Sequence, residues 1–232
     1  KPIKKEIIDG IPTEQYRLNS NNTGVPLFSF TTTVDGSSTI FDVVSTDLTN
    51  SAIIEATPKP GSSFSIIYRE DGRGSGSANT GFFSHFRQGT LDSGDFSVLN
   101  PSTNQTVGID ATNINNSDVW LYQLDETGTE SELWTKVDAV EGNNVIYNSL
   151  NKKIRNIYSV LSRADDRVSL IFSDGTFGNL PQGSFRTYYR TSKNRNLIIT
   201  PEDMRGISID VPYISSIGKT ETLSIVFELK YT

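Results

Sequence analysis

Residues 166–191 read DRVSLIFSDGTFGNLPQGSFRTYYRT, and this stretch decides the fold of the chain. A short apolar run precedes a connection rich in turn residues, and a run of alternating character follows it. Asp174 and Gly175 predict a tight turn. Gly178 supplies a second position without Cβ constraint, and residues 181–183 predict a bend back into the sheet. The stretch therefore predicts two strands joined by a structural loop, and nothing in it needs to be catalytic.

Similar short runs, separated by Gly, Pro, Asn and Asp, recur along the chain. They predict strands at 25–34, 39–44, 52–56, 64–69, 118–124, 133–140, 167–172, 184–190 and 222–231. The run 118–124 is apolar on both faces, which is typical of a buried strand. Turns are predicted at Asp35-Gly36 and at residues 92–94. One helical turn is predicted at 201–204, with Thr200 as its N-cap.

The composition agrees with a mainly β fold. The 232 residues include 60 Val, Ile and Thr against six Ala, and 18 Gly with nine Pro supply turns. We therefore expect short-stranded antiparallel sheets, sandwich-like, with one or two short helices. The Gly-rich run 72–81 predicts either a mobile loop or a domain boundary, and on the second interpretation the subdomains are residues 1–75 and 76–232. Because the first residue is Lys1, we expect the chain to be the β-rich part of a longer protein.

Several classes of chemistry are excluded by residue counts. The chain has no Cys, so disulfides, thiolate nucleophiles and Cys-ligated metals are excluded. Its single histidine, His85, excludes a His-rich metal site. A net charge of −6 disfavours nucleic acid as a partner. No apolar run is long enough to predict a membrane span.

Candidate catalytic groups have a simpler explanation in each case. His85 sits among phenylalanines, where a packed ring is favoured over a general base. The pair Asp165-Asp166 and a second acidic group raise the alternative of a two-carboxylate glycoside hydrolase. The second group comprises Asp125, Glu126, Glu130 and Glu132. Both groups fall in predicted polar loops, which favours solvated charges. The glycines at 72–76 precede no helix, which disfavours a phosphate site.

Basic residues form two modest groups. The first is the run 152–155, and the second lies beside the pair Tyr188-Tyr189 and comprises Arg186, Arg190, Lys193 and Arg195. Aromatic and basic side chains together can bind a single nucleic-acid strand. In an acidic chain, charge complementarity to another protein subunit is favoured.

The central stretch resembles the baseplate J-like proteins, structural subunits in the baseplates of contractile-tailed phages and related injection machines. The residues that carry the resemblance are Phe172, Asp174, Gly175, Gly178, Pro181, Gly183, Tyr189 and Arg190. The similarity extends upstream through Trp134 and residues 145–158. Ser173 departs from the pattern, because many members carry glycine there. Residues 146–161 have a helical spacing of apolar positions, but the resemblance implies a strand.

The resemblance implies a structural subunit of a phage baseplate wedge, part of a ring around the tail hub that rearranges on contraction. Its partners would be itself, as a homodimer or ring, and other wedge proteins. It would lie in the virion tail baseplate after assembly in the host cytoplasm. No cofactor, metal, small-molecule substrate or catalytic residue is implied, and the motif would be a structural turn.

Two other functions remain open. One is a carbohydrate-binding β-sandwich of a phage tail or fibre, in which exposed aromatic rings would stack on sugar. The candidate rings belong to Trp120, Trp134, Tyr188 and Tyr189. The other is the glycoside hydrolase described above.

Overall fold

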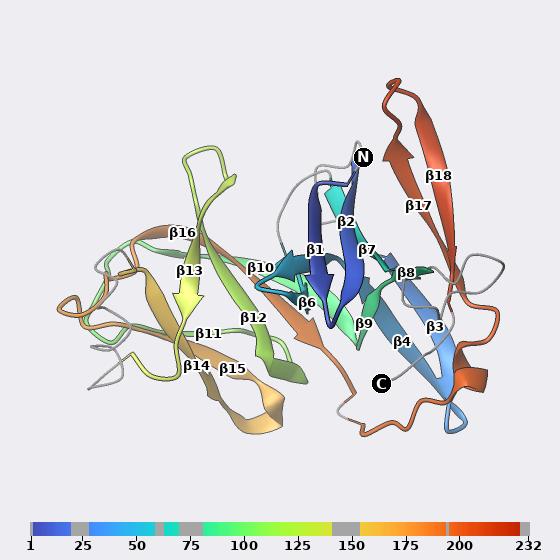
Figure 1. Cartoon of the computed structure of the whole chain (residues 1–232). Coiled ribbons are helices and arrows are strands. Elements are labelled where there is room, and N and C mark those ends of the chain that lie inside the picture. Colours follow the sequence, from blue (N-terminus) through green and yellow to red (C-terminus); the bar gives the residue numbers. More distant parts are fainter. Residues whose placement is uncertain are drawn as a thin grey trace. The chain divides into compact units, whose positions relative to one another are not determined.

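The computed structural model describes residues 2–19, 28–58, 63–69, 81–140, 154–193 and 195–227. The structure is 60% strand and 4% helix, in several short antiparallel sheets and one curled seven-stranded sheet (Figure 1). The mainly β fold expected from the sequence is confirmed. Within the described ranges, no helix is long and apolar enough to cross a membrane.

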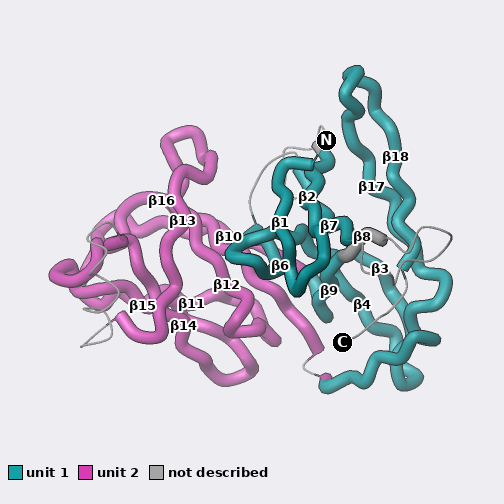
Figure 2. The backbone as a smooth tube through the Cα atoms, viewed as in Figure 1, with its two compact units in different colours: residues 1–90, 196–232 teal, residues 91–195 magenta. Residues whose placement is uncertain are grey.

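The chain forms two compact units (Figure 2). Unit 1 comprises residues 1–90 and 196–232, and unit 2 comprises residues 91–195. These limits differ from the sequence-based division at 75/76, because the last strands of the chain return to the core of unit 1. The Gly-rich run used to place that division lies largely at residues 70–80, outside the described residues.

Unit 1 contains four small sheets. Their strand orders are β1-β2-β7-β8, β3-β4-β9, β5-β6 and β17-β18. The elements are β1 (Lys4–Ile8), β2 (Ile11–Asn19), β3 (Phe28–Val34), β4 (Ser37–Val44), β5 (Thr46–Thr49), β6 (Ala52–Glu55), β7 (Ser63–Arg69), β8 (Gly81–Phe83), β9 (His85–Gln88), the 3-10 helix η2 (Pro201–Met204), β17 (Ser208–Ile214) and β18 (Thr220–Val226).

Two-residue turns close two hairpins of unit 1. Asp9 and Gly10 join β1 to β2 with φ values of 51° and 76°. Asp35 and Gly36 join β3 to β4 with φ values of 48° and 72°. Left-handed conformation at both central residues matches the twist of the flanking strands, which explains Asp-Gly at both sites. The turn predicted at 35–36 is confirmed.

The core of unit 1 joins residues from both ends of the chain. Phe30 and Phe41 stack with ring centroids 5.5 Å apart. Met204 and Val211 belong to the same buried cluster. The predicted helical turn at 201–204 is present as η2, and the Asp203 carboxylate accepts hydrogen bonds from the Thr200 N–H at 2.7 Å and hydroxyl at 2.8 Å.

Unit 2 is built on one seven-stranded sheet, ordered β10-β16-β12-β13-β14-β15-β11. Its elements are β10 (Thr90–Val98), β11 (Thr106–Gly108), β12 (Ile114–Leu124), β13 (Glu130–Lys136), β14 (Ile157–Ser162), the 3-10 helix η1 (Ala164–Asp166), β15 (Val168–Phe172) and β16 (Gly183–Thr191). β13 and β14 pair in parallel, whereas β12 is antiparallel to both β13 and β16.

Aromatic rings fill the core of unit 2. The Trp134 ring meets Phe172 and Phe185 edge to face, with centroids 5.4 Å away in both cases. Phe185 and Tyr189 are four residues apart on β16, so they lie on the same face of the strand, and both are part of this core. Strong contacts between rings of this kind hold the two strands of the central stretch against β13.

Most predicted strands are present, with two notable differences. Residues 92–94, predicted as a turn, lie inside β10, and β17 was not predicted. The strand choice for 146–161 is confirmed at 157–162 as β14, while residues 146–153 lie outside the described residues.

Candidate functional site

The candidate site is the connection from β15 to β16 with the strands that hold it, because these residues carry the family resemblance. It begins at Phe172, which is fully buried at the end of β15. Asp174 follows, and its Oδ1 accepts hydrogen bonds from the N–H of Thr176 at 2.8 Å and of Phe177 at 3.3 Å. The hydrogen bond from the Thr176 N–H lowers the pKa of Asp174. Asp174 therefore caps its own turn.

Gly175 provides the reversal that this turn needs. Its φ is +88°, a conformation that residues with a Cβ rarely adopt. The Arg155 guanidinium donates to the carbonyl oxygens of Gly175 at 3.4 Å and Thr176 at 3.2 Å. Arg155, predicted as part of a basic group, thus supports this turn.

Gly178 is required by close packing. A Cβ there would lie 2.7 Å from Cγ1 of Ile157 and 2.8 Å from Cβ of Ser173. The Gly178 N–H donates to Oγ of Ser173 at 3.0 Å, and the next residue, Asn179, donates its N–H to the Arg155 oxygen at 2.8 Å. Ser173, the residue that departs from the family pattern, is fully buried, and its hydroxyl oxygen accepts this hydrogen bond inside the turn.

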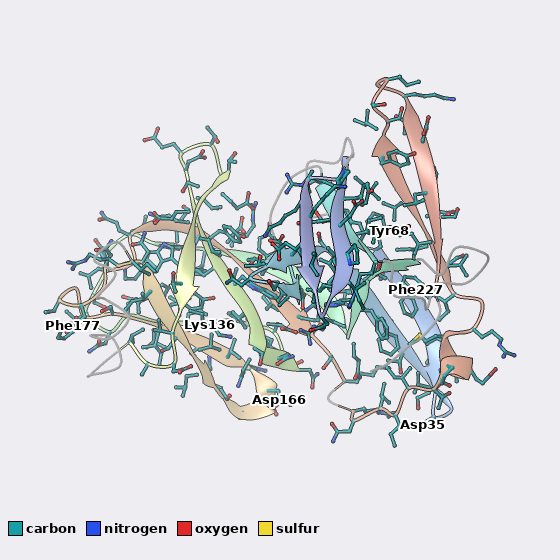
Figure 3. The ribbon with its side chains drawn as sticks, viewed as in Figure 1. Asp35, Tyr68, Lys136, Asp166, Phe177 and Phe227 are labelled. Atoms are coloured by element: carbon teal, nitrogen blue, oxygen red, sulfur yellow. The ribbon has the colours of Figure 1, made fainter. Side chains whose placement is uncertain are left out.

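The connection ends at a buried proline and a glycine. Pro181 is buried, and Gly183 begins β16 with φ +100°. The Phe177 side chain is 37% exposed on the same loop and points away from it (Figure 3). Most of the connection therefore serves packing and backbone geometry, and Phe177 is its exposed apolar group.

Tyr189 and Arg190 project to opposite faces of β16. Tyr189 is part of the aromatic core. Arg190 is only 1% exposed, its Nη1 lies 3.1 Å from Oδ2 of Asp118, and its guanidinium carbon lies 5.9 Å from the centre of the Trp120 ring. Burying a charged guanidinium costs free energy unless nearby groups stabilise its charge. Here the Asp118 carboxylate and the Trp120 ring both do so.

Arg186 forms a second charged group on β16. It bonds to Asp95 at 2.8 Å and to Glu130 at 2.7 Å, and Tyr188 donates its hydroxyl to the same Glu130 oxygen at 2.9 Å. Burial raises the pKa of Glu130, but hydrogen bonds from Arg186, its own backbone and Tyr188 outweigh it and leave the pKa below its ordinary value. Burial and Glu130 together raise the pKa of Tyr188 to about 12. These residues are held as an ion-paired network.

Only part of the acidic group predicted to lie in a loop does so in the structure. Asp125 lies in the β12–β13 turn, where its Oδ1 accepts the Thr127 hydroxyl at 2.6 Å and two backbone N–H groups. Glu130 and Glu132 lie in β13, and the Glu130 side chain is only 7% exposed. The expectation of solvated charges is wrong for Glu130, because pairing across three strands buries it.

The remaining catalytic candidates do not come together as an acid and base. Asp165 and Asp166 are exposed in the β14–β15 connection, with φ values of 60° and 49°. Glu126 is exposed in a different turn. A glycosidase acid needs a raised pKa, whereas that of Glu130 is lowered. His85 is half-buried in β9, where burial lowers its pKa and the Arg87 charge adds to this.

The proposed sugar-stacking rings are mostly inside the molecule. Trp134 is 3% exposed, and Tyr188 and Tyr189 are each 8% exposed. Trp120 is half-buried beside Arg190. A stacking platform needs exposed ring faces, so these four residues do not form one.

The structure also shows where the candidate metal-binding and basic residues lie. In the described ranges, no group of three or more His, Asp and Glu residues is arranged to hold a metal ion. Of the predicted basic groups, Lys152 and Lys153 lie outside the described residues, and Lys193 and Arg195 are exposed. Arg186 and Arg190 are engaged with carboxylates. Sequence reasoning missed their partners Asp95 and Asp118, which are 91 and 72 residues away.

The chain belongs to a family described as a domain of unknown function, DUF8360, whose model matches residues 1–232. No curated protein matches the sequence, and no solved structure matches it.

Proposed function

We propose that this chain is a structural subunit of a contractile-tail baseplate wedge and acts through contacts with copies of itself and with other wedge proteins. The observation that carries the proposal is the connection from Phe172 to Arg190. Its sequence resembles the baseplate J-like motif, and each glycine in it occupies a position that needs glycine. Its side chains are used for packing and turn geometry, as a mechanical role requires.

The charged network of unit 2 supports the same proposal. Arg190 with Asp118 and Arg186 with Glu130 tie strands that are distant in sequence. Such pairs favour one arrangement of the sheet. They are poorly suited to catalysis, because each charge is already neutralised by a neighbour. A subunit of a ring that rearranges under load needs units that keep their shape.

Co-assembly with candidate partners and binding to glycans together test the proposed function. The chain is co-expressed with the proteins encoded by the neighbouring genes, and the purified material is analysed by sedimentation velocity and electron microscopy. We expect a defined complex of fixed stoichiometry. A chain that joins none of these proteins, and that binds bacterial surface polysaccharide on a glycan array, would overturn the proposal in favour of a carbohydrate-binding module.

A further inference from the structure

Among the described residues, β17 and β18 pair with each other in a two-stranded ribbon, and no further strand pairs with β18 (Figure 1). Ser215 donates its N–H to the Lys219 oxygen at 2.8 Å, and Phe227 donates to the Ile207 oxygen at 2.9 Å. Because antiparallel residues alternate between hydrogen-bonded and non-hydrogen-bonded pairs, these two bonds fix the parity of the ladder. The odd-numbered residues of β18 bond to β17. The N–H and C=O groups of the even-numbered residues face away from β17; these residues are Thr220, Thr222, Ser224 and Val226.

The opposite edge of the ribbon is blocked. Pro212 lies opposite Thr222 in the register, so it is among the residues of β17 whose backbone faces away from β18. Proline has no N–H to offer there, which is a common protection of edge strands. β18 contains no proline, and its one charged side chain, Glu221, accepts a hydrogen bond from the Tyr213 hydroxyl at 2.8 Å. Within the ranges that the structure describes, the edge of β18 is therefore the one open to pairing.

The apolar layer of the ribbon also continues to the open edge. Ile209 and Val211 of β17 are buried, with 7% and 1% exposure. Their cross-strand partners, Ile225 and Leu223, lie on the same face and are only half-buried. On the other face of β18, Val226 is 72% exposed. A further strand beside β18 would cover these side chains and satisfy the open backbone groups together.

We propose that β18 of a second copy of this chain occupies the edge, antiparallel, about a two-fold axis at Leu223. This register aligns outward-facing residues with outward-facing residues: Thr222 opposite Ser224 and Thr220 opposite Val226. It forms about eight backbone hydrogen bonds between the copies. Isologous pairing of one strand with itself closes the contact and leaves no second open edge.

Side chains agree with this register. Leu223 lies opposite Leu223 of the other copy, and Ile225 flanks this pair on each side, which extends the apolar layer across the axis. Glu221 lies opposite Ile225, so the two carboxylates are four residues apart along the strand and do not face each other. The inference rests on the proposed function, since it names the surface through which the chain associates with itself.

Removing one outward N–H tests the contact. Sedimentation velocity of the whole chain should show a dimer that Thr222→Pro converts to monomer. The Thr222 N–H faces away from β17, so circular dichroism and the melting temperature should change little. If Thr222→Pro fails to fold, Thr222→Lys, which places a solvated charge on the open edge, should weaken dimerisation at least about tenfold. A wild-type monomer at all concentrations, or a dimer unaffected by the variants, overturns the inference.

A single introduced cysteine tests the register, because the chain has none of its own. In the proposed dimer the two Leu223 Cα atoms are about 4.5 Å apart, within reach of a disulfide. The two Ile225 positions are about 13 Å apart along the strands. We expect Leu223→Cys to form disulfide-linked dimers at least about tenfold faster than the matched control Ile225→Cys. Equal rates, or no cross-link, contradict the pairing.

The two proposals fail in different ways. A chain that co-assembles with neighbouring gene products but shows neither a dimer nor the Leu223→Cys cross-link retains the proposed function and loses this inference. A chain that dimerises through β18 but joins none of those proteins retains the inference as a self-association surface and loses the baseplate role.

Discussion

Gly178 and Ile157 are in such close contact that a Cβ on Gly178 would lie 2.7 Å from Cγ1 of Ile157. Ile157 is the first residue of β14, and Gly178 belongs to the loop between β15 and β16. The loop therefore packs directly on a strand 21 residues earlier, and the glycine is what permits this approach.

The first prediction follows from that contact. Gly178→Ala should lower the free energy of unfolding by about 1–3 kcal/mol, because Ile157 and Ser173 must move to admit the methyl group. Chemical denaturation at neutral pH measures the change. Gly94→Ala is the control, since a Cβ there would lie 3.9 Å from Cε1 of Tyr189, an ordinary van der Waals distance. Equal stability of the two variants would contradict the close packing of the loop.

The second prediction concerns the buried pair Arg190 and Asp118. Asp118→Leu should destabilise the protein by about 3–5 kcal/mol, because it removes the carboxylate that lies 3.1 Å from a buried guanidinium. The double variant Asp118→Leu with Arg190→Met should recover a large part of the loss, since no buried charge remains. A double-mutant cycle in urea measures the coupling, and strictly additive losses would show that the two side chains do not depend on each other.

The third prediction concerns Thr187, which is 1% exposed and faces the core of unit 2. Among the described residues, its Oγ1 has no hydrogen-bond partner. Thr187→Val keeps the shape and removes the buried hydroxyl, so it should stabilise the protein by about 1 kcal/mol. Thr135→Val on β13, where the side chain is exposed, should change stability little. A destabilised Thr187→Val variant would indicate that the hydroxyl is satisfied in solution.

The fourth prediction concerns pH. The pKa of Glu130 is lowered in the folded protein by Arg186, its own backbone and Tyr188, against the effect of burial. The stability that Glu130 contributes is therefore present above its unfolded pKa of about 4.3 and is lost as the pH falls through its folded value. Glu130→Gln should be less stable than the wild type at pH 7, and the difference should shrink toward pH 3.

Urea denaturation at several pH values checks this expectation. Glu132→Gln, an exposed position on the same strand, serves as the control for the substitution itself and should stay close to the wild type in stability at pH 7. A constant difference between Glu130→Gln and the wild type from pH 3 to pH 7 would exclude a role for ionised Glu130 in holding Arg186.

Local sequence patterns were sufficient for the fold class and for many individual elements. Alternation and apolar runs predicted β12, β15 and β16, because side-chain direction alternates along any strand regardless of its neighbours. Asp35-Gly36 and Thr200-Pro201 predicted their turns, because backbone conformation there depends on those residues alone. These interactions are local, so the sequence carries them directly.

Predictions were wrong where strand pairing outweighed local preference. Residues 92–94 carry turn residues, yet they lie inside β10 because this edge strand pairs with β16. The strand β17 contains Pro212, which argues against a strand, but Pro212 lies at a non-hydrogen-bonded position opposite Thr222, where the ladder needs no N–H from it. Neither outcome follows from a window of neighbouring residues.

By itself, the sequence determined a Cys-free, mainly β chain and a loop of fixed turn geometry from Phe172 to Gly183. Only the tertiary structure decided that the last strands complete unit 1, that Asp118 is the partner of Arg190, and that β18 presents an open edge. The physical reason is that turns and strand periodicity are properties of adjacent residues. Pairing, burial and ion pairs join residues tens of positions apart, and they exist only once the chain has folded.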